Sequence, residues 1–532
     1  MGRPLPFATC AGLGFSIICV CSAGPLNPVN AAAELNAIQQ ENTYLGTTEW
    51  RLTNPALHRE IEGYASLTSV DRGGSIALYV NTQEPSYDLA VYRMGWYAGR
   101  GARLVHGPVT LDGISQPPPN VDHENGLIEC EWHRPYILGL RDAAHQDAWT
   151  SGVYLTKLTG NRSGAQAYII FVVRDDARHS DFLFQSSVTT YQAYNNWGGK
   201  SLYDFNSDGR RAYKVSFNRP YAISSNPIAA FGNGAGDFLT NNAVPTSDPS
   251  SPAGWEYNMV RWLEREGYDI AYSTNIDTHA DPNLLSRHKA WLSVGHDEYW
   301  TWDMRRHVET ARDRGTHLAF FSGNTCYWQI RLEPSVTGEA NRIIVSYKDD
   351  APTKDPYASQ LPETQSRLTV RWRDYPVNNS EESLIGVMYD GNPVDGDIII
   401  TKPQHWVMAG TDLREGDRLA GLLGYEADRV FEHSPPGITI LAESPYQFEG
   451  RRHVAHLTIY SLDNRATVFA AGTIQWSWGL DDFNVPALRP SRLNPKVQQI
   501  TSNVLARFQR DSERNSQCHT DMKPDRIMQS HC

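Results

Sequence analysis

Short stretches in which apolar and polar residues alternate dominate the chain between about residues 45 and 176. Gly- and Pro-rich turns, such as residues 117–119, separate these stretches. Alternation with a period of two is typical of strands that bury one face, and it occurs at residues 75–80, 87–93, 152–157 and 167–173. Short strands broken by such turns predict a β-sandwich over residues 34–176. This segment contains no pattern of catalytic residues, so we expect it to be structural or to shield a substrate.

From about residue 180 the pattern changes to strands that alternate with helices. Residues 255–266 carry apolar side chains three and four positions apart, which predicts a helix that Gly267 ends. A second helix is predicted at 302–314, directly before Gly315. The expected strands are apolar runs at residues 182–187, 268–272, 288–294 and 317–322. Such alternation predicts a mostly parallel sheet with helices on its faces.

The C-terminal part is less regular. Residues 345–450 are polar and rich in proline, and we expect an irregular insertion there. Two further strands and an amphipathic helix are predicted at residues 454–459, 467–471 and 496–508. We therefore expect one α/β domain over residues 177–510 and a polar tail over residues 511–532.

The N-terminus has the pattern of a secretory signal. Arg3 precedes an apolar run over residues 7–21, and small residues follow as far as Ala33. The run is about 15 residues long, short of the ~20 that span a bilayer. We expect a signal peptide at residues 1–33 and a secreted or periplasmic protein with no membrane attachment after its removal; a retained anchor is the alternative.

Charge and cysteine content narrow the class of protein further. The 532-residue chain has a net charge of -12 and no cluster of Lys and Arg, which argues against nucleic-acid binding. Three of its seven cysteines lie in the expected signal. Among the other four, Cys518 and Cys532 in the polar tail are the best candidates for a disulfide in an oxidising compartment.

Polar side chains gather where the expected parallel strands end. Ligands bind beyond the carboxyl ends of the strands in open α/β sheets. Tyr, His, Glu and Asn occur there in the segments 190–199, 216–221, 295–300 and 323–328. This set suits a hard metal ion or acid–base chemistry. Taken singly, each tyrosine could instead be a core residue at the rim, and Asp297 or Asp303 could cap the helix that follows.

The known motifs of hydrolases separate the chemical alternatives. Neither HExxH nor GxSxG is present, and the histidines that could bind zinc are scattered, at His279, His288 and His296. Cys326 could act as a nucleophile with His296 as its base. Several phenols with one carboxylate would suit ferric iron, which would lower the pKa of the phenols and of a bound water.

Four segments carry a resemblance to a known family: TTYQAYNNWGGKSLY, FNRPY, WLSVGHDEYW and FFSGNTCYW. They resemble the C-terminal domain of the N,N-dimethylformamidase large (beta) subunit family, over roughly residues 180–500. The resemblance implies a flavodoxin-like, glutamine-amidotransferase-like α/β fold. It also implies a mononuclear Fe(III) held by two tyrosines and one glutamate, which hydrolyses a small N-alkylated formamide to formate and an amine.

The motifs assign residues to these roles. Glu298 of GHDEYW matches the carboxylate ligand, Tyr221 of NRPY matches one tyrosine ligand, and either Tyr191 or Tyr194 of TYQAY matches the other. His296, Asn324 and Glu426 match a histidine beside the ligands, a polar residue that faces the bound water, and a distal acid. The two tyrosine motifs are closer together than in formamidases, and an exported form departs from a cytoplasmic formamidase, so the substrate can differ.

Three hypotheses follow. In the first, Fe(III) polarises an amide carbonyl and lowers the pKa of water, while His296 or a second acid passes a proton to the leaving amine. The second is an amidotransferase-like enzyme with Cys326 as its nucleophile. The third is a non-catalytic, exported protein that binds glycans or another ligand through its Trp and Tyr side chains. Beyond a small amide substrate, the expected partners are further copies of the chain or a small subunit.

Overall fold

The computed structural model describes residues 34–141, 149–224, 226–241 and 253–520, with side chains up to residue 510. The chain divides into two compact units, residues 1–35 and 36–532, and all elements below belong to the second. The expected signal peptide, residues 1–33, lies outside the described residues, and so does the expected pairing of Cys518 with Cys532. Within the described ranges, no helix combines the length and apolar character needed to cross a bilayer.

The first part of this unit is a short helix, α1 (Ala37–Glu41), followed by strands in two sheets. One sheet is antiparallel and has the order β1 (Ile61–Ala65), β3 (Ser75–Thr82), β8 (Tyr136–Gly139). The other has the order β2 (Ser69–Asp71), β10 (Gln166–Arg174), β9 (Gly152–Gly160), β4 (Ser86–Met94), β5 (Ala102–Asp112). The hairpin of β6 (Asn120–Asp122) and β7 (Leu127–Glu129) contributes Ile128 to a buried cluster with Tyr64 of β1. All four strands predicted here by alternation are confirmed.

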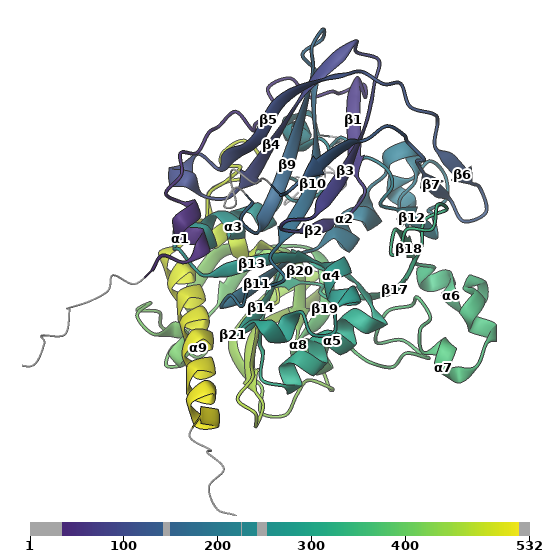
Figure 1. The fold of residues 1–532 in the computed structure, drawn as a ribbon. Coiled ribbons are helices and arrows are strands. Elements are labelled where there is room, and N and C mark those ends of the chain that lie inside the picture. Colours follow the sequence, from purple (N-terminus) through teal and green to yellow (C-terminus); the bar gives the residue numbers. More distant parts are fainter. Residues whose placement is uncertain (1–33, 142–148, 225, 242–252, 521–532) are drawn as a thin grey trace, which may run out of the picture. The chain divides into compact units, whose positions relative to one another are not determined.

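A single apolar core joins these two sheets. Ile76, Leu78 and Val80 of β3 are buried at every second position, and they pack in one cluster with Leu89 of β4 and Phe171 of β10. Figure 1 shows the strands of the two sheets, in purple and blue, close together. The period of two in the sequence therefore marks the side chains that face this core.

A seven-stranded sheet forms the centre of the second part. Its order is β13 (Ile270–Thr274), β11 (Phe182–Ser186), β14 (Ala290–His296), β16 (His317–Gly323), β23 (Thr467–Ala470), β22 (Arg451–Ser461), β21 (Thr439–Phe448). The first five strands are parallel, and the last two are antiparallel to their neighbours. The predicted parallel arrangement is thus confirmed for the strands that carry the apolar runs.

Helices cover both faces of this sheet. Phe182 and Phe184 of β11 pack in one core cluster with residues of α3 (Glu256–Arg265) and α9 (Pro495–Thr520). Leu183, between them, packs on the other face with residues of α5 (Trp302–Asp313) and α8 (Glu382–Ile385). Strands buried on both faces read as continuous apolar runs, which explains the sequence pattern. The last helix continues through Thr520, into the expected polar tail.

The expected irregular insertion at residues 345–450 is only partly irregular. Besides short helices such as α6 (Ala351–Lys354) and α7 (Pro362–Gln365), it holds two 12-residue strands, β19 (Met388–Ile399) and β20 (Arg418–Arg429), and the sheet strand β21. The pairing of β19 with β20 shifts register three times. Bulges and the Gly, Pro and Asp residues of β19 break the alternation by which strands are predicted.

A small sheet of four strands completes the fold, in the order β12 (Lys214–Ser216), β18 (Ile343–Val345), β17 (Trp328–Glu333), β15 (Tyr299–Thr301). The protein is therefore a mixed α/β structure with strands in several sheets, none of which closes into a barrel among the described residues. One core cluster contains Tyr92 and Tyr168 together with Phe184 and Tyr272. The expected boundary at residue 176 stays a prediction.

Candidate active site

Polar side chains meet at the carboxyl edge of the parallel strands. β14 ends at His296 and pairs there with Gly323, the last residue of β16, so that Asn324 follows beside it. β20 is brought to the same edge by a bridge between Ala427 and Thr473. Glu426 and His296 therefore lie close together, although Glu426 belongs to β20, far along the chain, and His296 ends a central strand of the sheet.

Glu298 is the centre of this cluster and is 3% exposed. The Tyr194 hydroxyl donates a hydrogen bond to its Oε2 at 3.0 Å, and the Tyr203 hydroxyl lies 2.9 Å from both carboxylate oxygens. The Tyr299 hydroxyl in turn donates to the Tyr203 oxygen at 2.5 Å. One carboxylate thus accepts hydrogen bonds from two phenols, and a third phenol supports them.

Local hydrogen bonds fix both phenols in place. Tyr194 ends α2 (Val188–Tyr194), the helix that follows β11. The loop after this helix folds back on it, because the Leu202 amide donates to the Ala193 carbonyl and the Asn206 side chain donates to the Tyr194 carbonyl. The rings of Tyr194 and Tyr203 are consequently stacked, with 4.4 Å between their centroids.

His296 links two carboxylates. Its Nε2 lies 3.4 Å from Glu298 Oε2 and 3.3 Å from Glu426 Oε2, while its Nδ1 lies 3.4 Å from the Tyr425 hydroxyl. Asn392 donates to the other oxygen of Glu426 at 2.8 Å. Among the described residues, neither His296 Nε2 nor Glu426 Oε2 has a partner in hydrogen-bond geometry. These two buried atoms therefore face each other as an ion pair and, apart from Glu298, have no other partner among the described residues.

A glycine places His296. Gly295 has a φ of +69°, in the left-handed region, and a Cβ at this position would overlap the Trp255 ring. The ring packs edge to face on His296, with 6.3 Å between centroids. Only glycine meets both conditions, which explains the Gly that precedes the His in GHDEYW.

Lys348 places a buried amino group beside this cluster. Its Nζ lies 3.2 Å from the centroid of the Tyr203 ring and 5.2 Å from that of Trp328. This nitrogen has no hydrogen-bond partner among the described residues, and the residue has a left-handed φ of 55°. Burial lowers the pKa of Lys348 to about 7, although the Glu298 carboxylate opposes this shift. The ammonium interacts with the face of a phenol instead of a carboxylate oxygen.

Burial and mutual charge shift the pKa values of the cluster. Burial alone would lower the pKa of His296, but the Glu426 and Glu298 carboxylates outweigh it and raise the value to about 9. Burial raises the pKa of Glu298, and it raises the pKa values of Tyr194 and Tyr203 well above the ordinary range, with a further contribution from Glu298. Without a cation, the phenols are therefore neutral hydrogen-bond donors.

Asn324 occupies the strand end beside His296 in a left-handed conformation, with a φ of 47°. Its amide donates to the Asp428 carboxylate at 2.9 Å, and its side-chain oxygen is buried with no partner among the described residues. Burial raises the pKa of Asp428 to about 7; the Asn324 hydrogen bond opposes the shift and the Glu426 charge adds to it. The side-chain oxygen of Asn324 is thus a buried polar atom that a ligand could satisfy.

Tyr191 and Tyr221 lie together in a hollow that Tyr194 also lines, and neither has a hydrogen bond to Glu298 in the described part of the chain. Their rings pack edge to face, with 6.4 Å between centroids, and they line a narrow space with Tyr194 and Asp237. Burial, and next the Glu256 carboxylate, raise the pKa of Tyr191 well above the ordinary range. Of the tyrosines predicted as ligands, Tyr194 is the one that hydrogen-bonds Glu298; the roles of Tyr191 and Tyr221 stay predictions.

A family model described as N,N-dimethylformamidase beta subunit-like, C-terminal, matches residues 88–490. The chain belongs to this family. The N,N-dimethylformamidase beta subunit of Paracoccus aminophilus is 25% identical over 73% of this chain and 56% of its own length. The protein of the same name from an Alcaligenes species is 24% identical over 63% of this chain and 45% of its own. The chain thus spans about half the length of these curated relatives.

The match to the dimethylformamidase beta subunit-like family begins within β4, earlier than the expected start near residue 180. It therefore includes strands of the N-terminal sheets as well as the seven-stranded sheet. A solved structure, murine CEACAM1b, matches 24% of this chain and 62% of its own at 14% identity and a TM-score of 0.12, a value too low to support a common fold.

Cys326, the alternative nucleophile, lies in the core of this family member. It is completely buried among apolar side chains, and Arg305 Nη1 lies 3.9 Å from its sulfur. Burial raises the pKa of the Cys326 thiol well above its ordinary value, although Arg305 opposes the shift. A nucleophilic cysteine needs a lowered pKa and access to substrate, so the structure disfavours this hypothesis.

Neither Asp297 nor Asp303 is the N-cap residue of α5. Asp297 accepts hydrogen bonds from Gln185, Asn275 and Ser293 within the protein interior. Thr301 is the residue that caps α5, by accepting from the Met304 amide, and Asp303 lies in the first turn of that helix. Asp297 therefore supports the strand end and does not cap the helix.

Sequence reasoning missed several residues of the cluster: Tyr203, Tyr299, Lys348, Tyr425 and Asp428. Two of them stand inside quoted family motifs, Tyr203 at the end of KSLY and Tyr299 directly after Glu298. Lys348 had no signal, because it lies in the polar segment where no element was expected. Among the described residues, no group of three or more His, Cys, Asp or Glu is arranged to hold a metal ion. A metal at Glu298 would therefore depend on the phenols.

Proposed function

We propose that this protein hydrolyses a small amide, at a formamide-type C–N bond, with the help of a mononuclear Fe(III). The observation that carries the proposal is the buried Glu298 carboxylate with the hydroxyls of Tyr194 and Tyr203 within 3.0 Å of its oxygens. The names of the two curated relatives, both N,N-dimethylformamidase beta subunits, favour the same substrate class.

Tyr194, Tyr203 and Glu298 are the residues that would hold the metal. Two phenols and a carboxylate form a hard oxygen donor set, which suits a highly charged cation. When bound, a ferric ion supplies Lewis acidity, which lowers the pKa of phenols and water and polarises a carbonyl group. Lys348 lies above the Tyr203 ring and balances part of the negative charge that deprotonated phenols would add.

The other polar residues are suited to proton transfer and orientation. His296 lies between Glu298 and Glu426, and the two carboxylates favour its protonated form. We assign it the proton that reaches the leaving amine nitrogen, with the Glu426 carboxylate as the group that holds and orients the imidazolium. Tyr425 and Asn392 hold these two side chains, and the free oxygen of Asn324 is suited to orient a water.

The test combines metal content with turnover. Protein expressed with iron is expected to contain one iron per chain, to show a visible tyrosinate charge-transfer band, and to release formate and dimethylamine from N,N-dimethylformamide. Glu298→Ala is expected to lose iron, colour and activity together, whereas the exposed control Glu363→Ala retains all three. A folded, iron-free, colourless protein with no amidase activity would overturn the proposal.

We also propose how the strands of the two parts of the fold are arranged. We infer that the two N-terminal sheets form a β-sandwich, since they share one apolar core, and that the seven-stranded sheet with its covering helices is flavodoxin-like. Experimental coordinates for the described ranges would test both inferences. Strands that cross at right angles, or a different order of the parallel strands, would contradict them.

Export and assembly are separate proposals. The apolar run at residues 7–21 supports export, and sequencing the N-terminus of the mature protein would locate a cleavage after Ala33. The relatives are named as subunits, which favours assembly with a small partner subunit or with further copies of the chain. Mass measurement by light scattering on protein purified from its host would identify either assembly.

A further inference from the structure

A small cavity, partly open to solvent beside the exposed Leu67, lies between the N-terminal sheets and the rest of the unit. It has about 30 Å³ of room for water-sized molecules and is lined on one side by β1 and β10, including Gly63 and Ile169. Arg219, Tyr221 and Arg342 line the other side. Because a water needs about 10–15 Å³ by this measure, the cavity has room for two or three non-hydrogen atoms. No residue given a role in the proposed function lines it.

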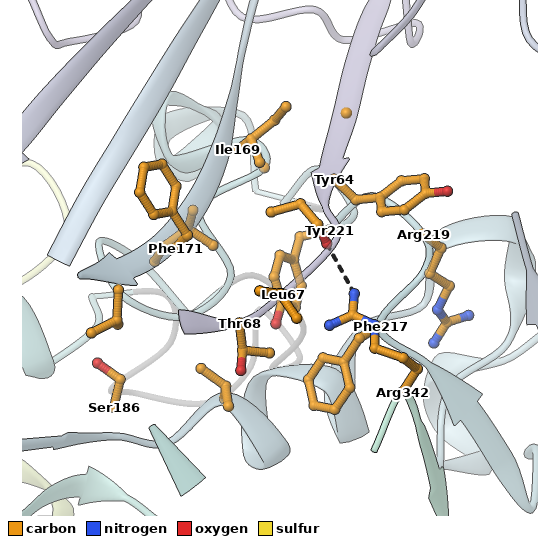
Figure 2. A pocket seen from close by; sticks show the side chains of 16 residues that line it. Tyr64, Leu67, Thr68, Ile169, Phe171, Ser186, Phe217, Arg219, Tyr221 and Arg342 are labelled. Atoms are coloured by element: carbon orange, nitrogen blue, oxygen red, sulfur yellow. Dashed lines mark hydrogen bonds between the residues drawn. The ribbon is translucent and has the colours of Figure 1, made fainter. Parts of the chain in front are cut away.

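Arg342 is buried at this cavity, with 3% of its surface exposed. Its Nε donates to the Asn218 side chain at 2.8 Å, and its Nη2 donates to the Ala65 carbonyl at 2.9 Å. Its Nη1 makes no hydrogen bond to the described residues. Figure 2 shows Arg342 and Arg219 on one side of the pocket, with the apolar Ile169 and Phe171 on the other.

Arg219 is the second buried guanidinium, with 1% exposed. Its terminal nitrogens donate to the backbone carbonyls of Asn195, Trp197 and Lys200, and its Nε is buried without a partner among the described residues. Carbonyl groups satisfy hydrogen bonds, but they carry no net charge. Arg219 is thus fixed in position while its charge remains unbalanced.

No carboxylate balances either charge at close range. In the described part of the chain, neither Arg219 nor Arg342 has an Asp or Glu oxygen within 4.0 Å. The acids that act on Arg342 from further away, Glu129 and Glu339, accept hydrogen bonds from other groups, such as Ser216 and Ser335. Two buried and unpaired charges are costly, and proteins normally offset such charges with a counter-ion.

We propose that this cavity binds a small monovalent anion, either a halide or a one-carbon carboxylate such as formate. The two guanidinium groups supply charge, Arg342 Nη1 supplies free N–H donors, and the buried Ser186 hydroxyl in the lining has no partner among the described residues. The narrow interior of the cavity favours anions of two or three non-hydrogen atoms. The bound anion ties the N-terminal sheets to the remainder of the unit, because both contribute to the lining.

The experiment measures thermal unfolding of the purified full chain in sodium chloride, sodium formate and sodium gluconate at equal sodium concentration. A site that binds a small anion predicts that chloride or formate raises Tm in a saturable way, by about 2–3 °C at 100 times Kd, relative to gluconate. A response to chloride alone identifies a halide site, and a response to formate alone identifies a carboxylate site. Equal Tm in all three salts overturns the proposal.

Variants and a heavier halide locate the effect. Arg342→Met is expected to abolish the anion dependence and Arg342→Lys to retain part of it. Arg489→Met is the matched control, because Arg489 is also buried but lines no part of this cavity. Should Arg342→Met fail to fold, bromide-soaked crystals of the unchanged protein decide the matter. An anomalous peak between Arg219 and Arg342 supports the site, and bromide on the surface alone overturns it.

Discussion

The Tyr203 hydroxyl lies 2.9 Å from both carboxylate oxygens of Glu298, although 95 residues separate the two along the chain. The contact exists because the loop after α2 folds back on that helix and brings Tyr203 to Glu298, two residues after the end of β14. Tyr203, not Tyr221, is consequently the second phenol at the carboxylate. The hydrogen bonds therefore favour Tyr203 as a metal ligand, whereas the family motif alone suggested Tyr221.

The first prediction tests that difference directly. Tyr203→Phe removes one proposed ligand and is expected to reduce bound iron and the tyrosinate band, and to lower kcat/KM by about 100-fold or more. Tyr221→Phe is the matched control and is expected to leave both the band and the iron content unchanged. The reverse result, with loss in Tyr221→Phe alone, would return the ligand role to Tyr221.

The second prediction concerns proton transfer. Glu426→Gln removes the carboxylate 3.3 Å from His296 Nε2 while keeping the shape of the side chain. Activity is expected to fall by about 10²–10⁴-fold with iron content unchanged, since general acid–base groups contribute rate enhancements of that order. The pKa of His296 is also expected to fall, because Glu426 is the main group that raises it. Titration by NMR of labelled histidine would measure it.

The third prediction is that Cys326→Ala stays active. The thiol is buried in an apolar cluster, so its removal is expected to destabilise the protein by about 1–2 kcal/mol without changing kcat. Denaturant unfolding and turnover with N,N-dimethylformamide measure the two effects. A folded but inactive variant would revive the nucleophile hypothesis.

The fourth prediction uses two glycines with positive φ. Gly295→Ala forces a Cβ into the Trp255 ring as well as an unfavourable backbone, so we expect a loss of more than about 4 kcal/mol of stability, or no folding. Gly315→Ala, after α5, meets no atom within 4 Å and has only the backbone cost, about 1 kcal/mol. Equal destabilisation of the two variants, measured by denaturant unfolding, would contradict the steric argument.

The fifth prediction is a dependence of stability on pH. Burial lowers the pKa of His288 to about 4, and its Nδ1 lies 2.9 Å from the Ser180 hydroxyl. The unfolded chain, with a His pKa near 6.5, then binds more protons than the folded chain between about pH 4 and 6.5. Stability is therefore lost as the pH falls through this window, by up to about 3 kcal/mol. His288→Asn is expected to flatten that part of the pH profile of unfolding; an unchanged slope would count against this origin.

Local patterns in the sequence determined most of the regular elements. The alternation at residues 75–80 marked β3, which buries one face, and the continuous apolar run at 317–322 marked β16, which is buried on both faces. The long strands β19 and β20 were missed, since bulges and Gly, Pro and Asp residues conceal their period. Strand ends also pointed to His296, Glu298 and Asn324, because parallel strands end at one edge of a sheet.

The sequence by itself thus determined most strands and helices, the order of the motifs, and the edge of the parallel sheet at which the polar side chains lie. Only the tertiary structure decided which tyrosines reach Glu298, that Lys348 lies above one of them, and that Cys326 is enclosed in the core. Secondary structure follows from the periodic burial of neighbouring residues. Contacts between segments 95 or more residues apart depend instead on how loops close and how layers pack, which no local pattern specifies.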